Sequence, residues 1–337
     1  MQPPGSSVSP SRPRPAVGTC LVVDAGRTSC RVALYGPSGP SHTGTGPQVV
    51  IGPGLPGVAD GDRSAAPIVA ALAPLLGRVA LPPGPLDAVC VGMTGVLRPG
   101  PAAVAVAAAV RGLVPARRVL VTSDVVTGYC GAVGLGPGVV VAAGTGMIAL
   151  AVGELGVARV DGWGFMLGDA GSGFEIGRRG LAAALRAHDG RGGGSALLAE
   201  LATRAFGPLD EVIHTVYGAD NPVGAVAAFA AGVATAARRG DEVAAAIWAS
   251  AASEIAATAL AAAGRACGPD ERATVSWTGG LFDATDLLLE PFLAHLAARR
   301  PSLAARAPLG SALDGGRVLA GAPAGHPLLD LVHVALA

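Results

Sequence analysis

The stretch GTCLVVDAGRTSCRVALY at residues 18–35 decides the fold, because a second version of it, GVVVAAGTGMIAL, recurs at residues 138–150. In each, an apolar β-branched run leads into a short stretch of small residues, and a second apolar run follows. The pattern predicts a strand, a tight glycine turn and an antiparallel strand. Such turns offer backbone N–H groups and hydroxyls without side-chain bulk, which suits a phosphate. One turn in each half of the chain therefore predicts a nucleotide held between two related domains, and phosphoryl transfer.

The composition favours a protein with two domains. The chain has 337 residues, 51% of them hydrophobic, which is enough for two buried cores. The formal net charge is +0 and the basic residues are scattered, so the sequence indicates no nucleic-acid-binding face. No lysine occurs, so only arginine side chains or backbone N–H groups can clamp a phosphate.

Three features bear on where the protein works. Residues 1–17 are rich in Pro and Ser and carry no apolar core segment, so we expect a disordered tail rather than a signal peptide. The apolar run 243–263 is long enough to span a bilayer, but it is mostly Ala and includes Glu254, which predicts a buried helix and no membrane contact. The 5 cysteines form no CxxC pair, which is typical of small buried side chains in a reducing compartment. We therefore expect a cytoplasmic protein.

Strands and helices alternate through the first half of the chain, which predicts an α/β architecture. Buried strands are expected at 87–93, ending in the small residues Thr94 and Gly95, and at 117–123. The Gly/Pro/Ser-rich stretch 36–64, with GPGLPG at its centre, is long enough for a binding loop or a lid. The other expected elements are helices at 65–79, 101–113 and near 174–187, Ala-rich helix to about 266, a strand within 272–282 followed by a helix, and a final apolar helix at 325–336.

Two aspartates stand where phosphoryl transfer needs carboxylates. Asp24 ends the first apolar strand, and a carboxylate beside a phosphate-binding turn can hold Mg²⁺. The alternative is a turn aspartate that bonds its own backbone. Asp124 follows a buried strand, where open α/β sheets bind ligands, and it can take the proton of an attacking hydroxyl. The alternative for Asp124 is the N-cap of the next helix, and the two roles use the same geometry.

The loop DGWGFMLGDAGSG (161–173) combines an aromatic ring with carboxylates. Trp163 lies among small residues, with Asp161 and Asp169 nearby. This set suits a sugar, whose hydroxyls need polar partners and whose C–H face needs an apolar one. A tryptophan that packs at the edge of a core is the alternative. The pair Gly279-Gly280 permits close approach to the backbone, either by a nucleoside or within a strand bulge.

Five stretches, in order and spacing, resemble the N-acetylglucosamine kinases and the related BadF/BadG-type ATPase group, within the superfamily of actin, sugar kinases and heat-shock chaperones. The resemblance covers roughly residues 18–325 and implies two ribonuclease-H-like (actin-like ATPase) lobes with ATP and an amino sugar in the cleft between them. The implied domains are an N-terminal lobe at 18–134, on which helix 325–336 packs, and a C-terminal lobe at 135–324. The stretches are VVDAGRTSCRVAL, TSDVVTGYCGA, VVVAAGTGMIAL, DGWGFMLGDAGSGFEIGRRGL and VSWTGGLF.

The resemblance also implies an activity and residue roles. The activity is ATP-dependent phosphorylation of the 6-hydroxyl of an amino sugar, N-acetylglucosamine first, by a protein that is expected to form a homodimer. Asp124 takes the place of the base that activates this hydroxyl. By the matching positions, Gly162, Trp163 and Asp169 contact the sugar, and we expect Thr94, Gly95 and Asp124 to contact it as well. The implied ATP-contacting positions are Gly26, Arg27, Thr28 and Ser29 in the first turn, Gly144, Thr145 and Gly146 in the second, and Gly279 and Gly280 in the adenosine motif.

Departures from the family pattern keep alternatives open. Arg27 stands where the family usually has Lys or Gly, and GPGLPG has no Asn where the family often places one in a sugar loop. Glucosamine and N-acetylmuramic acid are therefore alternative substrates. ATP-driven activators of radical dehydratases share the phosphate motifs but hold an iron–sulfur cluster through cysteines, and this chain has none between Gly131 and Ala266. A non-catalytic sugar sensor is the third class.

Overall fold

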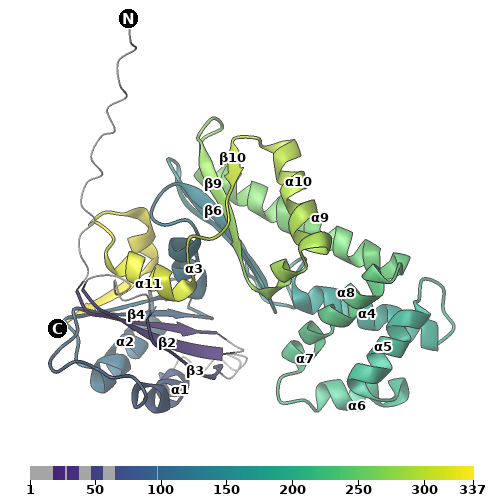
Figure 1. Ribbon diagram of the computed structural model, residues 1–337, viewed down its shortest axis with the longest axis horizontal. Coiled ribbons are helices and arrows are strands. Elements are labelled where there is room, and N and C mark those ends of the chain that lie inside the picture. Colours follow the sequence, from purple (N-terminus) through teal and green to yellow (C-terminus); the bar gives the residue numbers. More distant parts are fainter. Residues whose placement is uncertain (1–17, 27–28, 38–46, 56–64, 97) are drawn as a thin grey trace, which may run out of the picture.

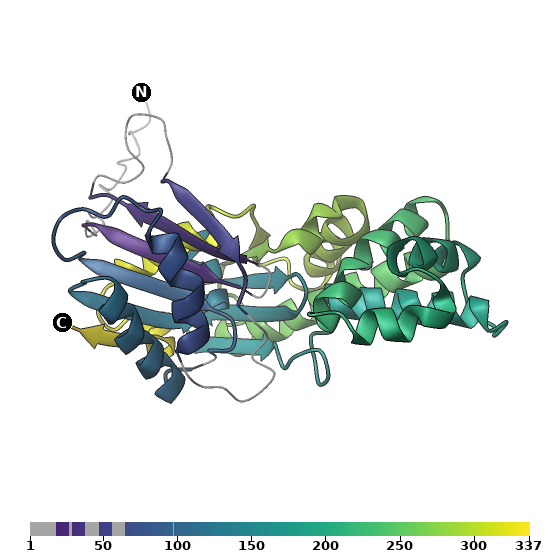
Figure 2. The ribbon, with the colours of Figure 1, turned by 90° about the horizontal axis from the view of Figure 1, so that it is seen from below.

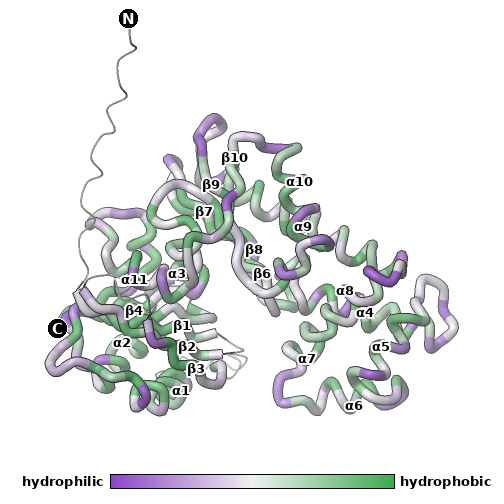
Figure 3. The backbone as a smooth tube through the Cα atoms, viewed as in Figure 1, coloured by the Kyte–Doolittle hydropathy of each residue, from purple (hydrophilic) through white to green (hydrophobic). Residues whose placement is uncertain are grey.

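Each of the two hairpin motifs forms the centre of a β-sheet, and the two sheets belong to two lobes (Figure 1). The structure is a computed structural model that describes residues 18–26, 29–37, 47–55, 65–96 and 98–337. Turned by 90°, it shows the helices of the second lobe extending away from the first (Figure 2). Hydrophobic residues concentrate in the strands and in the helix faces packed on them (Figure 3).

The N-terminal sheet has the strand order β11-β5-β4-β1-β2-β3. Strands β1, β4 and β5 are parallel, and the other neighbours pair antiparallel. Parallel strands begin and end together, so the carboxyl ends of β1, β4 and β5 share one edge. The bounds are β1 Cys20–Ala25, β2 Ser29–Tyr35, β3 Val49–Pro53, β4 Ala88–Met93, β5 Arg118–Ser123 and β11 His333–Leu336.

The C-terminal sheet repeats this topology. Its order β8-β7-β6-β9-β10 matches β3-β2-β1-β4-β5, with the same parallel and antiparallel pairs in the same places. The prediction of two related lobes from two related hairpins is confirmed. The bounds are β6 Gly138–Ala143, β7 Met147–Gly153, β8 Gly156–Asp161, β9 Ala273–Thr278 and β10 Leu303–Ala305.

Helices cover both faces of the N-terminal sheet. Helices α1 (Ala66–Leu76) and α2 (Pro101–Leu113) bury Leu72 and Val106 against one face. Helices α3 (Asp124–Ala132) and α11 (Ala312–Ala320) lie on the other face, and their core also includes Val140 and Leu150 of the C-terminal sheet. Helix α3 is therefore packed between the two sheets, and it begins with Asp124.

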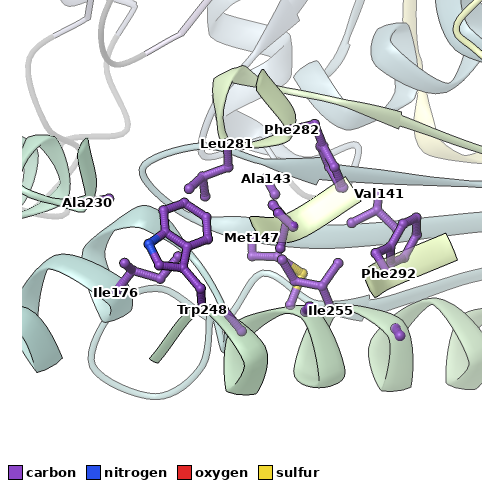
Figure 4. Packing of buried hydrophobic residues seen from close by; sticks show 14 of the residues in the cluster. Val141, Ala143, Met147, Ile176, Ala230, Trp248, Ile255, Leu281, Phe282 and Phe292 are labelled. Carbon is purple, nitrogen blue, oxygen red and sulfur yellow. The ribbon is translucent and has the colours of Figure 1, made fainter. Parts of the chain in front are cut away.

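The second core lies on the far face of the C-terminal sheet. There Met147 and Ile255 meet the rings of Trp248, Phe282 and Phe292 (Figure 4). The elements involved are α4 Gly173–His188, α5 Ala196–Phe206, α6 Val212–Tyr217, α7 Pro222–Ala228, α8 Ala230–Arg238, α9 Glu242–Ala266 and α10 Glu290–Arg299, with short helices η1 Leu209–Glu211, η2 Gly280–Asp283 and η3 Thr285–Leu289.

Three expectations from the sequence need correction. Residues 49–53, expected in a loop or lid, form the edge strand β3 on β2. The expected helix at 325–336 is a short 3₁₀ helix, η4 (Pro327–Leu331), followed by β11, which pairs with β5 in the N-terminal sheet. The N-cap of α3 is Ser123, and Asp124 is the first helical residue. The expected disordered tail at 1–17 lies outside the described residues.

Helix α9 is the apolar run that the sequence singles out. In the described part of the chain it is the one helix long and apolar enough to cross a membrane. Its residues Trp248, Ile255 and Ala259 are buried in the second core. That burial favours the expected core helix. All 5 cysteines are buried and free, as expected, and burial raises the pKa of Cys20 and of Cys130 to about 12. Such thiols stay protonated and unreactive at neutral pH.

Candidate functional site

The carboxyl edge of the N-terminal sheet collects four of the predicted residues. Asp24 of β1 is in register with Gly92 of β4, which is in register with Thr122 of β5. Thr94 and Gly95 follow β4 and Asp124 follows β5, so all of them lie at this edge. The Thr94 N–H donates to the Ala25 carbonyl (3.1 Å), which fixes the β4 end against the first turn.

Asp24 is a largely buried carboxylate that lies beside Arg31. Its side chain is 14% exposed, and Arg31 Nε lies 3.8 Å from its Oδ2. Burial raises the pKa of Asp24, the charge of Arg31 opposes the rise, and the charge of Asp124 adds to it. Two carboxylates therefore act on one another across this edge, and a bound cation would relieve their repulsion.

Asp124 stands at the joint between β5 and α3. Its Oδ1 accepts hydrogen bonds from the Val125 backbone N–H (2.8 Å) and from the Ser123 hydroxyl (3.1 Å). Its carbonyl accepts from the Thr127 hydroxyl at 2.9 Å. These bonds orient the carboxylate, and the first turn of a helix is a favourable place for a negative charge. The side chain is half-buried, so a substrate hydroxyl can reach it.

The first predicted phosphate turn is closed by a hydrogen bond from the Gly26 N–H to the Ser29 carbonyl (3.0 Å). The Gly26 carbonyl accepts from the Leu55 N–H (2.9 Å), which ties Leu55 of the GPGLPG segment to the turn. Arg27 and Thr28, also predicted to bind phosphate, lie outside the described residues.

The second turn, Gly144-Thr145-Gly146, is held by the start of α4. The N–H groups of Gly173 and Phe174 donate to the carbonyls of Gly144 (2.8 Å) and Thr145 (3.1 Å). In a trans peptide the N–H points opposite to the C=O. The N–H groups of Thr145 and Gly146 therefore point away from α4, where they can donate to a ligand. This is the arrangement expected of a phosphate-binding turn.

The predicted adenosine motif lies beside this second turn. Thr278 is in register with Ala142, and Gly279 follows it with a positive φ of 101°. A Cβ on Gly279 would collide with the Ala143 carbonyl, so only glycine fits this close approach. Across the lobes, a Cβ on Gly128 of α3 would lie 3.7 Å from the Thr278 methyl carbon. Residues i and i+4 share a helix face, so the Asp124 end of α3 lies near the adenosine motif.

The predicted sugar loop has two strained aspartates. Asp161 and Asp169 both have φ of 59°, a conformation that is uncommon for residues other than glycine. The Asp161 carboxylate accepts from the N–H groups of Asp169 (2.7 Å) and Ala170 (3.1 Å). Asp169 is 8% exposed, and its Oδ1 accepts from the Gly164 N–H at 3.2 Å. The loop is thus held by its own carboxylates.

Asp169 is buried, whereas Trp163 is exposed. A Cβ on Gly146 would approach Asp169 Oδ2 to 2.6 Å, so this carboxylate lies against the second phosphate turn. Trp163 is 62% exposed, which argues against a ring that fills the edge of a core. The guanidinium of Arg159 lies over its ring, 4.3 Å from the centroid. Gly162, with φ of 70°, turns the chain from β8 into the loop.

Two arginines at the site escaped the sequence analysis. Arg159 lies on β8, and Arg98 follows Gly95 in the N-terminal lobe. Burial lowers the pKa of Arg159, the charge of Arg98 lowers it further, and Asp161 acts in the opposite direction. The sequence did offer a signal for Arg159, which is a charged residue in the apolar strand VARVD. It stands two positions before Asp161, and strand residues two apart share a face.

The site fits a magnesium ion. The carboxylates of Asp24 and Asp124 are hard oxygen donors that repel each other at one edge. The described residues contain no group of three or more His, Cys, Asp or Glu side chains able to hold a metal. Mg²⁺ commonly uses one or two protein carboxylates and takes its other ligands from substrate phosphates and water.

Comparison with known proteins gives consistent results. The chain is similar to a candidate N-acetylglucosamine kinase from Chromobacterium violaceum, with 25% identity and a TM-score of 0.67 over 91% of this chain and 100% of that one. It shares its fold with a ROK family glucokinase from Streptomyces griseus solved with glucose and AMPPNP (18% identity, TM-score 0.55, 90% and 98% covered).

A curated relative matches over a shorter length. This N-acetylmuramic acid/N-acetylglucosamine kinase from Clostridium acetobutylicum is 33% identical over 107 residues, which is 32% of this chain and 35% of that protein. The family model of the BadF/BadG/BcrA/BcrD ATPases matches residues 22–295, which include both turns, Asp24, Asp124 and the Gly279-Gly280 motif. The expected family is thus confirmed: the chain belongs to the BadF/BadG/BcrA/BcrD ATPase family.

Proposed function

We propose that this protein is an ATP-dependent kinase that phosphorylates the 6-hydroxyl of an amino sugar, with N-acetylglucosamine as the first substrate to test. One observation carries the proposal. Asp124, between the sheets at the start of α3, lies near the adenosine motif, and that motif touches the second phosphate turn. Asp169 of the proposed sugar loop lies against Gly146 of the second turn, so the proposed base, the proposed nucleotide contacts and the proposed sugar contacts are neighbours.

The reaction follows from these positions. The oxygen of the sugar hydroxyl attacks the γ-phosphorus of ATP, the bond from that phosphorus to the bridging oxygen breaks, and ADP leaves with the electron pair. Asp124 takes the hydroxyl proton as the new P–O bond forms. The N–H groups of Thr145 and Gly146 donate to phosphate oxygens. Asp24, with Asp124 nearby, would hold Mg²⁺, which supplies charge neutralisation on the phosphates when bound.

The relatives support an amino sugar. The C. violaceum protein is named for N-acetylglucosamine and the C. acetobutylicum protein for both N-acetylmuramic acid and N-acetylglucosamine. N-acetylmuramic acid is therefore the second candidate substrate, and glucosamine is the third. The proposal includes a cytoplasmic location and a homodimer, and light scattering on the purified protein tests the dimer.

A coupled ADP-release assay over a panel of neutral, acetylated and acidic amino sugars tests the activity. We expect ADP release that depends on the sugar and on Mg²⁺, with phosphorus NMR placing the new phosphate on the 6-oxygen. The folded variant Asp124→Asn is the matched control. If no amino sugar stimulates ADP release, the kinase proposal fails. Calorimetric sugar binding without turnover would then favour the sugar sensor.

A further inference from the structure

Arg159 lies on the side of the C-terminal sheet that faces the other lobe. Leu150 of β7 is in register with Arg159 of β8, and Val152 with Val157. Residues directly opposite in an antiparallel pair share a face. Leu150, Val152 and Val157 belong to the core between the lobes, together with Val22 of β1. Arg159 therefore projects from the sheet face that is turned toward the N-terminal lobe.

The guanidinium of Arg159 is only partly satisfied there. Its Nη1 is buried and has no hydrogen-bond partner among the described residues. The nearby carboxylate of Asp161 is already engaged by the N–H groups of Asp169 and Ala170. Burying a cationic donor without an acceptor is costly, so the position favours an anion that is not part of this chain.

The charge of a second arginine, in the other lobe, also acts on Arg159. Arg98 is exposed in the loop after Thr94 and Gly95, and its charge acts on Arg159. Two like charges brought together between two lobes repel each other unless an anion lies between them. Guanidinium groups are suited to carboxylates and phosphates, because their planar N–H donors match two oxygens at once.

The position of Arg159 on β8 keeps it away from the second phosphate turn. Arg159 is in register with Leu150, four residues along β7 from Gly146 at the end of the second phosphate turn, or about 13 Å at the usual rise of a strand. The Arg159 guanidinium lies instead over the ring of Trp163, and Arg98 follows Thr94 and Gly95 in the sequence. Trp163, Thr94 and Gly95 are proposed sugar contacts.

We propose that Arg98 and Arg159 bind a carboxylate carried by the amino-sugar substrate, so that acidic amino sugars are the preferred class. The inference rests on the proposed function and narrows its substrate. N-acetylmuramic acid is the test compound, because its lactyl ether ends in a carboxylate while the rest of the molecule is N-acetylglucosamine. Its lactyl methyl ester removes the charge and keeps the size.

Calorimetric titration of the acid and of its methyl ester tests this inference without turnover. The wild-type protein should bind the acid about 10- to 100-fold more tightly than the ester, the usual value of a charge-assisted hydrogen bond. In Arg159→Gln and in Arg98→Gln this preference should disappear, while ATP affinity stays unchanged. Arg204→Gln, at a side chain that is 70% exposed and bonded to Glu200, is the matched control and should keep the preference.

Steady-state kinetics with the acid as substrate provide a second test. The carboxylate interaction is the same in the ground and transition states, so its loss should raise KM for the acid and leave kcat unchanged. Equal binding of acid and ester by the wild type, or a preference that survives in both variants, overturns the inference. Reduced ATP affinity in Arg159→Gln would assign the pair to a nucleotide phosphate instead. If Arg159→Gln does not fold, Arg98→Gln in its exposed loop carries the test.

The two proposals fail differently. If the wild-type protein releases ADP with N-acetylglucosamine but binds the acid no more tightly than its methyl ester, the kinase proposal stands and the carboxylate site is removed. If the protein binds the acid tightly but no amino sugar causes ADP release, the carboxylate site stands and the kinase proposal fails.

Discussion

Replacing Asp124 by asparagine separates the two roles of this side chain. Its Oδ1 accepts from the Val125 N–H and from the hydroxyl of Ser123, which is 5% exposed. Asparagine keeps an oxygen in that place and nearly the same volume, but it cannot take a proton from a sugar hydroxyl. Asp124→Asn should therefore keep the start of α3 and lose the base.

The structure sets the expected magnitudes. Loss of general-base catalysis lowers kcat by roughly 10²–10⁴-fold, or about 3–5 kcal/mol of activation free energy. The same change removes only the favourable charge at the helix start, about 0.3–1 kcal/mol of stability. Asp124→Ala loses the same catalysis but also removes the acceptor of two hydrogen bonds, which costs about 1–3 kcal/mol of stability.

Steady-state ADP release at saturating ATP and sugar gives kcat, and urea unfolding gives the free energy of unfolding. The two variants should share the loss of kcat and differ in stability. A folded Asp124→Asn protein with near-normal kcat refutes the reasoning and assigns Asp124 to the start of α3 alone.

Three further predictions test other parts of the structure. Trp163→Ala should weaken sugar binding and leave ATP binding unchanged, because the ring is 62% exposed and does not support the fold around the phosphate turns. Asp169→Ala should weaken the binding of both ligands, because its carboxylate lies against Gly146 of the second turn. Calorimetric titration of each ligand tests both variants. Sugar and ATP together should draw the lobes closer, and an unchanged radius of gyration in small-angle scattering at saturation would contradict closure. The hydrogen bond from Arg238 lowers the pKa of Asp286 to about 2 from 3.8, so the ionised Asp286 contributes its full stability above pH 3.8 and loses it as the pH falls toward 2. In denaturant unfolding, Asp286→Asn should therefore destabilise the protein above pH 3.8 and no longer do so near pH 2. A difference in stability that stays constant over this range would refute the prediction.

The hairpins, the buried strands and most helices were predictable because their signals are local. The runs around Val22 and Val140 are β-branched and end in glycine turns, so pattern and turn chemistry agree. The same holds for α2, where Pro101 stands at the first helical position. Asp24 and Asp124 were chosen as candidates because each follows such a run.

The elements that escaped depend on pairing with distant strands. Residues 49–53 end in Gly52-Pro53, and both residue types disfavour a strand. The segment nevertheless pairs with β2 at the edge of the sheet, where proline is tolerated. The final segment is apolar and reads as a helix, but β5 offers it an open edge, and tertiary pairing prevails over local preference. Arg98 and Arg159 lie in different lobes, so no local pattern links them.

Helix α3 connects the chemistry to the packing of the whole molecule. A Cβ on Gly92 of β4 would collide with the Thr127 side chain, and a Cβ on Gly315 of α11 would collide with the Thr127 carbonyl. Small residues thus let α3 lie directly on its neighbours, where even one added methyl group must displace it. A displaced α3 moves Asp124 away from Asp24 and from the adenosine motif together, since a Cβ on Gly128 of the same helix would lie 3.7 Å from the Thr278 methyl carbon. The position of the proposed base therefore depends on the close packing of Gly92 and Gly315 against α3.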